Sequence, residues 1–328
     1  MNQTMNRTVN QTMDQHMNRT VNQQTKQTSD HMKLRLGKLS YLNNAPMYYR
    51  LAKNYHSHLA GRYEIVEGSP SYLNRCIRQK EIDLTVASSI EYARNLEHYL
   101  ILPNLSISSD GPVKSVVLMS RVPMEKLDKQ PLLLSSDSET SVALIKIILS
   151  RQGIEPVYIR GKVPVAENGN GTLSPDLAAD FAALLVIGDR ALQLCGQNTF
   201  PFVYDLGEEW KRMTGLPFVF ALWMVRQEAY DRDRQLVFQL WQALLASRDY
   251  SLSHPEEFIA SVKTQASLPR AVCLSYIQQN LRYELSSRYQ EGLKMYYRFL
   301  YELGEIPQPV QALRFMDLMK QWNSPFVS

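Results

Sequence analysis

The sequence predicts an α/β protein of two lobes, with mixed, mainly parallel sheets and a helical C-terminal region. Three observations support this fold class. From Lys33 to about residue 225, short apolar runs alternate with amphipathic runs, a pattern typical of successive strands and helices. Two longer apolar runs, at 115–121 and 218–225, lie where the chain would leave the first lobe and return to it. From Glu228 onward the pattern is almost entirely helical.

These two crossings predict a discontinuous first lobe, residues 32–117 plus 219–328, and an inserted second lobe, residues 118–218. A length of 328 residues suits two domains, since a domain has roughly 150 residues. Residues 1–31 form an Asn/Gln/Thr tract in which MNRTVNQ occurs twice. This tract has too few large apolar side chains to offset its ordering entropy, so we expect it to be disordered.

The first series of elements begins directly after this tract. Ser69 followed by Pro70 favours a helix start, because serine caps helices and proline suits the first turn. The patterns predict strands at 34–39, 63–67, 84–87 and 115–120, with helices at 46–55, 70–79 and 90–98.

The second series repeats the alternation. The helix expected at 141–151 stops before Gly153, a residue that suits a helix C-terminus. The remaining patterns predict strands at 131–134, 157–160, 184–187, 203–205 and 218–225, and helices at 177–183 and 208–213. After residue 228 we expect about four helices, with breaks near Pro255, Pro269 and 307–309.

Composition and motifs exclude several classes of function. The net charge of +4, from 36 basic and 32 acidic residues without a long basic run, argues against nucleic acid as a partner. Cys76, Cys195 and Cys273 lie far apart, and no Cys/His spacing suits a metal, so we expect reduced thiols and no metal site. The glycine-rich phosphate loops and the nucleophile elbow are absent. With no membrane-length apolar run and no secretory signal, we expect a cytoplasmic protein.

Five polar clusters fall where a strand ends or a helix begins. They are 40–44, 88–89, 106–115, 135–141 and 188–189. Free N–H groups and the dipole at a helix N-terminus favour an anion, and serine hydroxyls add donors without charge. Each cluster also suits a plain cap or turn: Ser138 or Thr140 could simply cap a helix, and Asn43 could make a turn. The residues alone therefore predict an anion-binding cleft and stop there.

At these same clusters the chain resembles a known family. The segments KLSYLNNAP, EIDLTVASSIEYARN, SSDSETSVALIKIIL and LLVIGDRAL occur in the order found in the chorismate dehydratases of menaquinone (futalosine pathway) synthesis. The resemblance covers about residues 33–300 and implies a fold similar to type II periplasmic binding proteins. It also implies a hydro-lyase that converts chorismate to 3-[(1-carboxyvinyl)oxy]benzoate and water without a cofactor.

The resemblance further implies roles for single residues. Asn43, in the SYLN segment, and Ser115, after the GPV turn, correspond to the family's active-site residues. The resemblance also assigns the substrate carboxylates to the turns of Ser88, Gly111, Thr140 and Ser141. From the polar clusters themselves, substrate binding is expected for Ser89, Ser138 and Asp189 as well. We expect chorismate as the partner and neither nucleic acid nor membrane, while monomer and homodimer both stay open.

Three other interpretations are compatible with a discontinuous first lobe and an inserted second lobe. The chain could be a non-catalytic small-anion solute-binding protein, or the 1,4-dihydroxy-6-naphthoate synthase of the same pathway, or the effector domain of a transcription regulator. The expected lack of an export signal argues against the first, and the SYLNNAP segment argues against the second. The third would need a helix-turn-helix before residue 32, where the sequence shows none.

Overall fold

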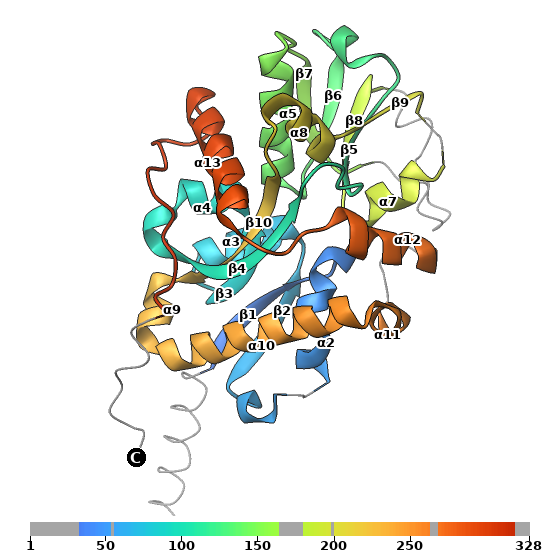
Figure 1. Cartoon of the computed structure of the whole chain (residues 1–328). Coiled ribbons are helices and arrows are strands. Elements are labelled where there is room, and N and C mark those ends of the chain that lie inside the picture. The colour runs from blue at the N-terminus through green and yellow to red at the C-terminus, as the bar shows by residue number, and fades with distance from the viewer. Residues whose placement is uncertain (1–32, 54–55, 164–179, 198–199, 263–267, 319–328) are drawn as a thin grey trace, which may run out of the picture.

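Two five-stranded sheets, one above the other in Figure 1, organise the chain. The computed structural model describes residues 33–53, 56–163, 180–197, 200–262 and 268–318. The expectation of disorder for residues 1–31 lies outside these ranges.

The first sheet has the strand order β2-β1-β3-β10-β4. Its strands are β1 (Leu34–Leu39), β2 (Tyr63–Gly68), β3 (Leu84–Ser88), β4 (Tyr99–Ser109) and β10 (Phe218–Arg226). Strand β1 pairs in parallel with β2 and β3, and β10 pairs antiparallel with β3 and β4. Every residue of β3 and β10 is buried, which agrees with their mainly apolar sequences.

The second sheet has the order β7-β6-β8-β5-β9. Its strands are β5 (Val116–Ser120), β6 (Pro131–Ser135), β7 (Val157–Gly161), β8 (Ala183–Ile187) and β9 (Phe202–Asp205). Strand β6 pairs in parallel with β7 and β8, and β5 pairs antiparallel with β8 and β9.

The mixed sheets agree with the expected fold class, although parallel pairings do not predominate. Among the described strands there are four parallel and four antiparallel pairings. The antiparallel ones all involve β5 and β10, the two apolar runs that connect one sheet with the other. The chain passes into the second sheet through β5 and returns to the first sheet through β10, and each of these strands is antiparallel to its neighbours.

Helices cover both sheets, and Figure 1 shows α10 lying along the first sheet beside α2. The helices are α2 (Ala45–Ala52), α3 (Pro70–Arg78), α4 (Ser89–Arg94), α5 (Glu139–Arg151), α7 (Asp189–Cys195), α8 (Leu206–Thr214), α9 (Gln227–Arg232), α10 (Arg234–Ser253), α11 (Pro255–Ser261), α12 (Arg270–Ser275) and α13 (Ser287–Glu302). Ser69 caps α3 as expected, since its hydroxyl accepts the N–H of Tyr72.

Three predictions about elements need correction. Strand β4 was not predicted, and it includes Ser106–Ser109, which the sequence analysis assigned to a polar cluster. Its hydroxyls satisfy one another: Ser106 Oγ and Ser108 Oγ are 2.7 Å apart, so burial is tolerated. Helix α7 was not expected. For the helix expected at 177–183, residues 177–179 lie outside the described ranges, Asp180–Ala182 are not helical, and Ala183 begins β8.

Candidate active site

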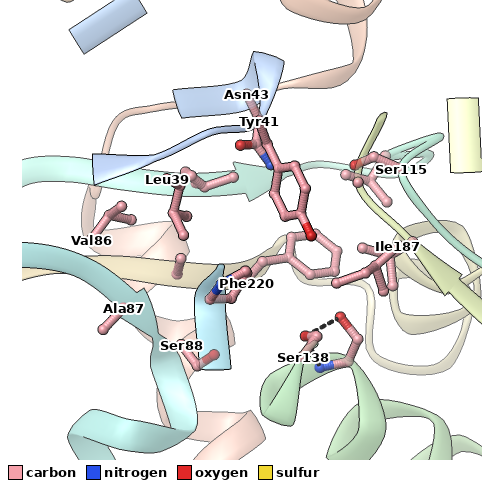
Figure 2. A pocket seen from close by; sticks show the side chains of 17 residues that line it. Leu39, Tyr41, Asn43, Val86, Ala87, Ser88, Ser115, Ser138, Ile187 and Phe220 are labelled. Atoms are coloured by element: carbon pink, nitrogen blue, oxygen red, sulfur yellow. Dashed lines mark hydrogen bonds between the residues drawn. The ribbon is translucent and has the colours of Figure 1, made fainter. Parts of the chain in front are cut away.

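A cavity of about 570 Å³ lies between the two sheets, at the carboxyl ends of β1, β3 and β8. Apolar side chains from both sheets line it, including Val86 and Ile187, with Phe220 of β10 among them (Figure 2). Helices α3, α4 and α5 begin at its rim, because each follows directly on a strand end or a short turn. Such a crevice is where open α/β sheets bind ligands.

Five of the nine residues expected from the sequence line this cavity. They are Asn43, Ser88, Ser115, Ser138 and Ser141. Figure 2 shows Asn43 and Ser115 near one end of the cavity, with Ser88 and Ser138 toward the other. The remaining four, Ser89, Gly111, Thr140 and Asp189, lie outside the lining. The substrate-binding roles of all seven turn residues stay predictions.

The N-terminus of α5 provides uncharged donors at one end of the cavity. The Ser138 hydroxyl accepts the N–H of Ser141 at 3.1 Å and donates to Ser141 Oγ at 2.8 Å (Figure 2). With its oxygen occupied by Ser138, the Ser141 hydroxyl is left to donate its own hydrogen. Free N–H groups of the first turn and the dipole of this 13-residue helix add partial positive charge there.

The start of α4 faces the start of α5 across the gap between the sheets. Ser88 is held by its backbone, since its N–H donates to Asn74 Oδ1 at 3.1 Å. Behind it, the N–H of Ile90 lies 3.4 Å from Thr140 Oγ1, and Ser89 Oγ lies equally far from the same oxygen. Thr140 and Ser89 therefore join the two segments and do not face the cavity.

Two consecutive tyrosines of α13 reinforce this junction. The Tyr296 hydroxyl donates to the Thr140 carbonyl at 3.2 Å, and the Tyr297 hydroxyl donates to the Ser89 carbonyl at 2.8 Å. Both side chains are buried. The C-terminal helix thus binds the site segments of both sheets at once, a contact that no local sequence pattern could reveal.

Asn43 lies in a short 3₁₀ helix, Leu42–Asn44, that connects β1 to α2. Its Oδ1 is buried and has no hydrogen-bond partner within the described residues. The Asp189 carboxylate, expected to bind substrate, instead accepts the N–H of Leu42 at 3.1 Å. Asp189 is 2% exposed, so it holds the Asn43 turn from behind.

The backbone around Ser115 is fixed at three points. The Asp205 carboxylate accepts the N–H groups of Val113 at 3.0 Å and Lys114 at 2.6 Å, and Lys114 has a left-handed φ of +63°. The N–H of Gly188 donates to the Ser115 carbonyl at 2.7 Å. Burial raises the pKa of Asp205, and its backbone N–H donors oppose that rise.

Sequence reasoning did not identify Asp205, which appeared only as the last residue of the strand expected at 203–205. The spacing of Asp205 and Glu208 is a helix N-cap signal, and Asp205 does cap α8 by accepting from Gly207 and Glu208. The second task of the same carboxylate, holding the turn before Ser115, involves residues 91 positions away. No local motif carries that information.

Tyr41 reaches into the cavity from the Asn43 side (Figure 2). Its ring packs on Gly188, where an added Cβ would come within 3.2 Å of two ring carbons. Burial, with the negative charges of Asp137 and Asp189 nearby, raises the pKa of Tyr41 to about 12. The hydroxyl therefore stays protonated and can serve as a donor.

Gly111 serves the turn that precedes Ser115. Its φ of +112° is one that side chains disfavour, and its carbonyl accepts the Ser109 hydroxyl at 2.8 Å. A Cβ on Gly207 would lie 2.5 Å from the same carbonyl oxygen. Gly111 is thus a close-packed backbone position outside the cavity lining.

The cavity offers hydrogen-bond donors and no cationic side chain. Within the described residues, no lysine or arginine belongs to its lining. Over the same ranges, no group of three or more His, Cys, Asp or Glu is arranged to hold a metal ion. None of the described helices combines the length and apolar character needed to cross a bilayer. An anion in this cavity would be held by hydroxyls, amides and helix N-termini.

Comparison with known families gives a match over most of the chain. A family model described as menaquinone biosynthesis matches residues 34–302. The chain belongs to this menaquinone biosynthesis family. The match spans both sheets and includes every residue placed at the cavity above.

Curated relatives agree with membership of the menaquinone biosynthesis family. The chorismate dehydratase of Thermus thermophilus is 28% identical over 271 residues, covering 78% of this chain and 93% of that protein. The chorismate dehydratase of Campylobacter jejuni is 29% identical over 190 residues, covering 56% of this chain and 64% of that protein.

Solved structures show the fold of this family member. A protein of Archaeoglobus fulgidus matches with a TM-score of 0.67 and 18% identity, covering 84% of this chain and 99% of that one. The periplasmic aliphatic sulphonate-binding protein of Escherichia coli matches with a TM-score of 0.62 and 12% identity, covering 87% and 92%. The expected two-lobed, periplasmic-binding-protein-like fold is therefore confirmed.

Proposed function

We propose that this protein is a chorismate dehydratase, which converts chorismate to 3-[(1-carboxyvinyl)oxy]benzoate and water. Its family and the names of its two curated relatives support this activity. The observation that carries the proposal is the shared cavity of Asn43 and Ser115, the two residues that the resemblance marks as active-site groups. They are 72 positions apart in the sequence and meet only through the fold.

The cavity suits a small dianion with an apolar ring. Val86, Ile187 and Phe220 supply apolar contacts, and the α5 N-terminus with Ser138 and Ser141 supplies donors for one carboxylate. Uncharged donors in a dry site bind a carboxylate without a strong ion pair that would have to be broken on release.

The reaction needs little help from strong acids or bases. Chorismate has a cyclohexadiene ring with a hydrogen on C3 and a hydroxyl on C4, so losing water makes the ring aromatic. In the proposed step, the enolpyruvyl carboxylate of the substrate takes the C3 proton. The C–H electron pair becomes the C3–C4 double bond, the C4–O bond breaks, and the departing hydroxide leaves as water with that proton. No oxidant, reductant or cofactor is required for this balance.

Asn43 and Ser115 act on the departing oxygen in this proposal. A serine hydroxyl and an amide N–H aimed at developing negative charge stabilise it without reorganising, because the fold already fixes their positions. The cavity also fixes the geometry of the ring and excludes bulk water, which favours one elimination conformer.

The test is turnover of chorismate by the purified chain without added cofactor, followed by mass spectrometry for loss of one water. We expect product from the wild type and a fall in kcat of about 10²–10³ for Asn43→Ala and for Ser115→Ala, the usual cost of one lost preorganised donor. Ser120→Ala is a matched control, because its buried hydroxyl bonds the Val122 carbonyl at the far end of β5, outside the cavity lining. Tight chorismate binding without product would instead favour a solute-binding protein.

Two further expectations join this proposal. We propose the lobe boundaries expected from the sequence, since one sheet draws its strands from residues 34–109 and 218–226 and the other from 116–205. We also propose that the protein works in the cytoplasm, where Cys76, Cys195 and Cys273, all free in this structure, would stay reduced.

A further inference from the structure

Tyr276 lies directly behind Ser115, although 161 positions separate them in the sequence. Its hydroxyl donates to Ser115 Oγ at 2.7 Å, and its side chain is 2% exposed. Ser115 lines the cavity, whereas Tyr276 does not. The tyrosine therefore reaches the cavity through Ser115 and, by a further side-chain hydrogen bond, through Asn43.

The backbone that carries Tyr276 is unusual and firmly held. Tyr276–Asn280 form a π-helix, a rare conformation that occurs often at functional sites. At its end, Asn280 Nδ2 donates to the Pro112 carbonyl at 3.0 Å, three residues before Ser115. Arg282 and Ser108 exchange both backbone hydrogen bonds at 2.8 Å. The π-helix is thus fastened to the same turn that presents Ser115.

We propose that Tyr276 is a positioning residue that orients the Ser115 hydroxyl toward the substrate. A serine hydroxyl has one hydrogen to donate and lone pairs to accept with. When Tyr276 donates to Ser115 Oγ from behind, the hydrogen of Ser115 is directed away from the tyrosine, into the cavity. Hydrogen bonds in such a chain also strengthen one another, so Ser115 becomes a better donor.

The Tyr276 hydroxyl is protonated, as its role as donor to Ser115 Oγ requires. Burial raises its pKa well above the ordinary value for tyrosine, and the charges of Asp189 and Asp205 add to that rise. Hydrogen bonds with Ser115 and Asn43 lower the pKa but do not outweigh burial. The hydroxyl therefore keeps its hydrogen at neutral pH and can serve as the donor to Ser115 Oγ.

The chain offers a matched control in Tyr283. Tyr283 is also 2% exposed and lies seven residues further along, but its hydroxyl is buried without a hydrogen-bond partner within the described residues. Tyr283→Phe removes the same atom from the same region without touching Ser115. The pair of variants separates the Tyr276 hydrogen bond from general effects on packing.

The inference rests on the proposed dehydratase activity, and its test is a double-variant cycle on kcat. We expect Tyr276→Phe to lower kcat about tenfold, the size of one neutral hydrogen bond, with KM changed by no more than about twofold. Tyr283→Phe should turn over like the wild type. Ser115→Ala combined with Tyr276→Phe should lose clearly less than the product of the two single losses, because the tyrosine acts mainly by orienting the serine.

Each outcome decides between the two claims. If the wild type converts chorismate but the losses of Ser115→Ala and Tyr276→Phe multiply, or if Tyr283→Phe is as slow as Tyr276→Phe, the positioning role is wrong and the dehydratase assignment stands. If the wild type gives no product, the dehydratase assignment fails and the positioning role fails with it.

Discussion

Substituting Gly188 by alanine tests whether the Tyr41 ring is held in the cavity by close approach of the second sheet. Gly188 has φ of 68° and ψ of −154°, a region that glycine almost alone occupies. Forcing alanine into it costs about 1–3 kcal/mol. The new Cβ would also lie 3.2 Å from two carbons of the Tyr41 ring, so the ring must shift within the cavity.

We therefore expect Gly188→Ala to affect both stability and turnover. A loss near 2 kcal/mol corresponds to a lowering of the unfolding midpoint by about 3 °C for a chain of this length. Because the displaced ring would occupy substrate space, kcat/KM should fall at least tenfold, or by about 1.4 kcal/mol of transition-state binding. Thermal unfolding and steady-state kinetics on one preparation measure both effects.

Gly153→Ala is the control for backbone strain alone. Gly153 has φ of +71° and no atom within 4 Å of an added Cβ. This variant should lose about 1–2 kcal/mol of stability and keep the kcat/KM of the wild type. If Gly188→Ala keeps wild-type kcat/KM as well, the ring is not held as described, and the contact between Tyr41 and Gly188 has no part in shaping the site.

Two further predictions concern charge. Burial raises the pKa of the Asp83 carboxyl, but the backbone N–H and side chain of Arg35 and the Arg226 side chain outweigh it, so the pKa is lowered. Ionised Asp83 should therefore stabilise the fold above about pH 4, and this contribution should be lost as the pH falls further. Thermal unfolding of Asp83→Asn should depend less on acid pH than that of the wild type. An unchanged pH profile would contradict this role of Asp83. Because no lysine or arginine of the described residues lines the cavity, KM for chorismate should rise only weakly with ionic strength, and a steep rise would reveal a cation at the site.

Local patterns in the sequence were sufficient for most of the fold. Strand β1 has the bounds that its apolar pattern predicts, and α3 begins at the expected Ser69 cap because capping needs only neighbours within a few residues. Strand β4 was missed because its buried serines were assigned to a polar cluster. Their burial is tolerated because the Ser106 and Ser108 hydroxyls bond each other and Ser106 also donates to the distant Glu284 carbonyl.

The sequence predicted which short polar turns form the candidate site, but not the contacts between distant segments that complete it. Asn43 and Ser115 follow from short motifs, and the fold brings them into one cavity. Asp189 was expected to bind substrate, which stays a prediction, and its carboxylate accepts the N–H of the distant Leu42, a contact that the sequence did not reveal. Tyr276 could not be found at all, since a lone tyrosine in a helical stretch carries no signal. Its partner Ser115 lies 161 positions away, in the turn before β5. Which polar residue faces the ligand depends on packing between distant segments.

The structure of the protein crystallised with its proposed product, 3-[(1-carboxyvinyl)oxy]benzoate, tests the central claim most directly. We expect the product between the sheets, with one carboxylate within about 3.2 Å of Ser138 or Ser141 and the ring C4 edge facing Asn43 and Ser115. A second cavity, lined in part by Lys38 and Lys53, lies beside the first and offers the charged alternative. Product bound there, with the Asn43 and Ser115 cavity empty, would contradict the account.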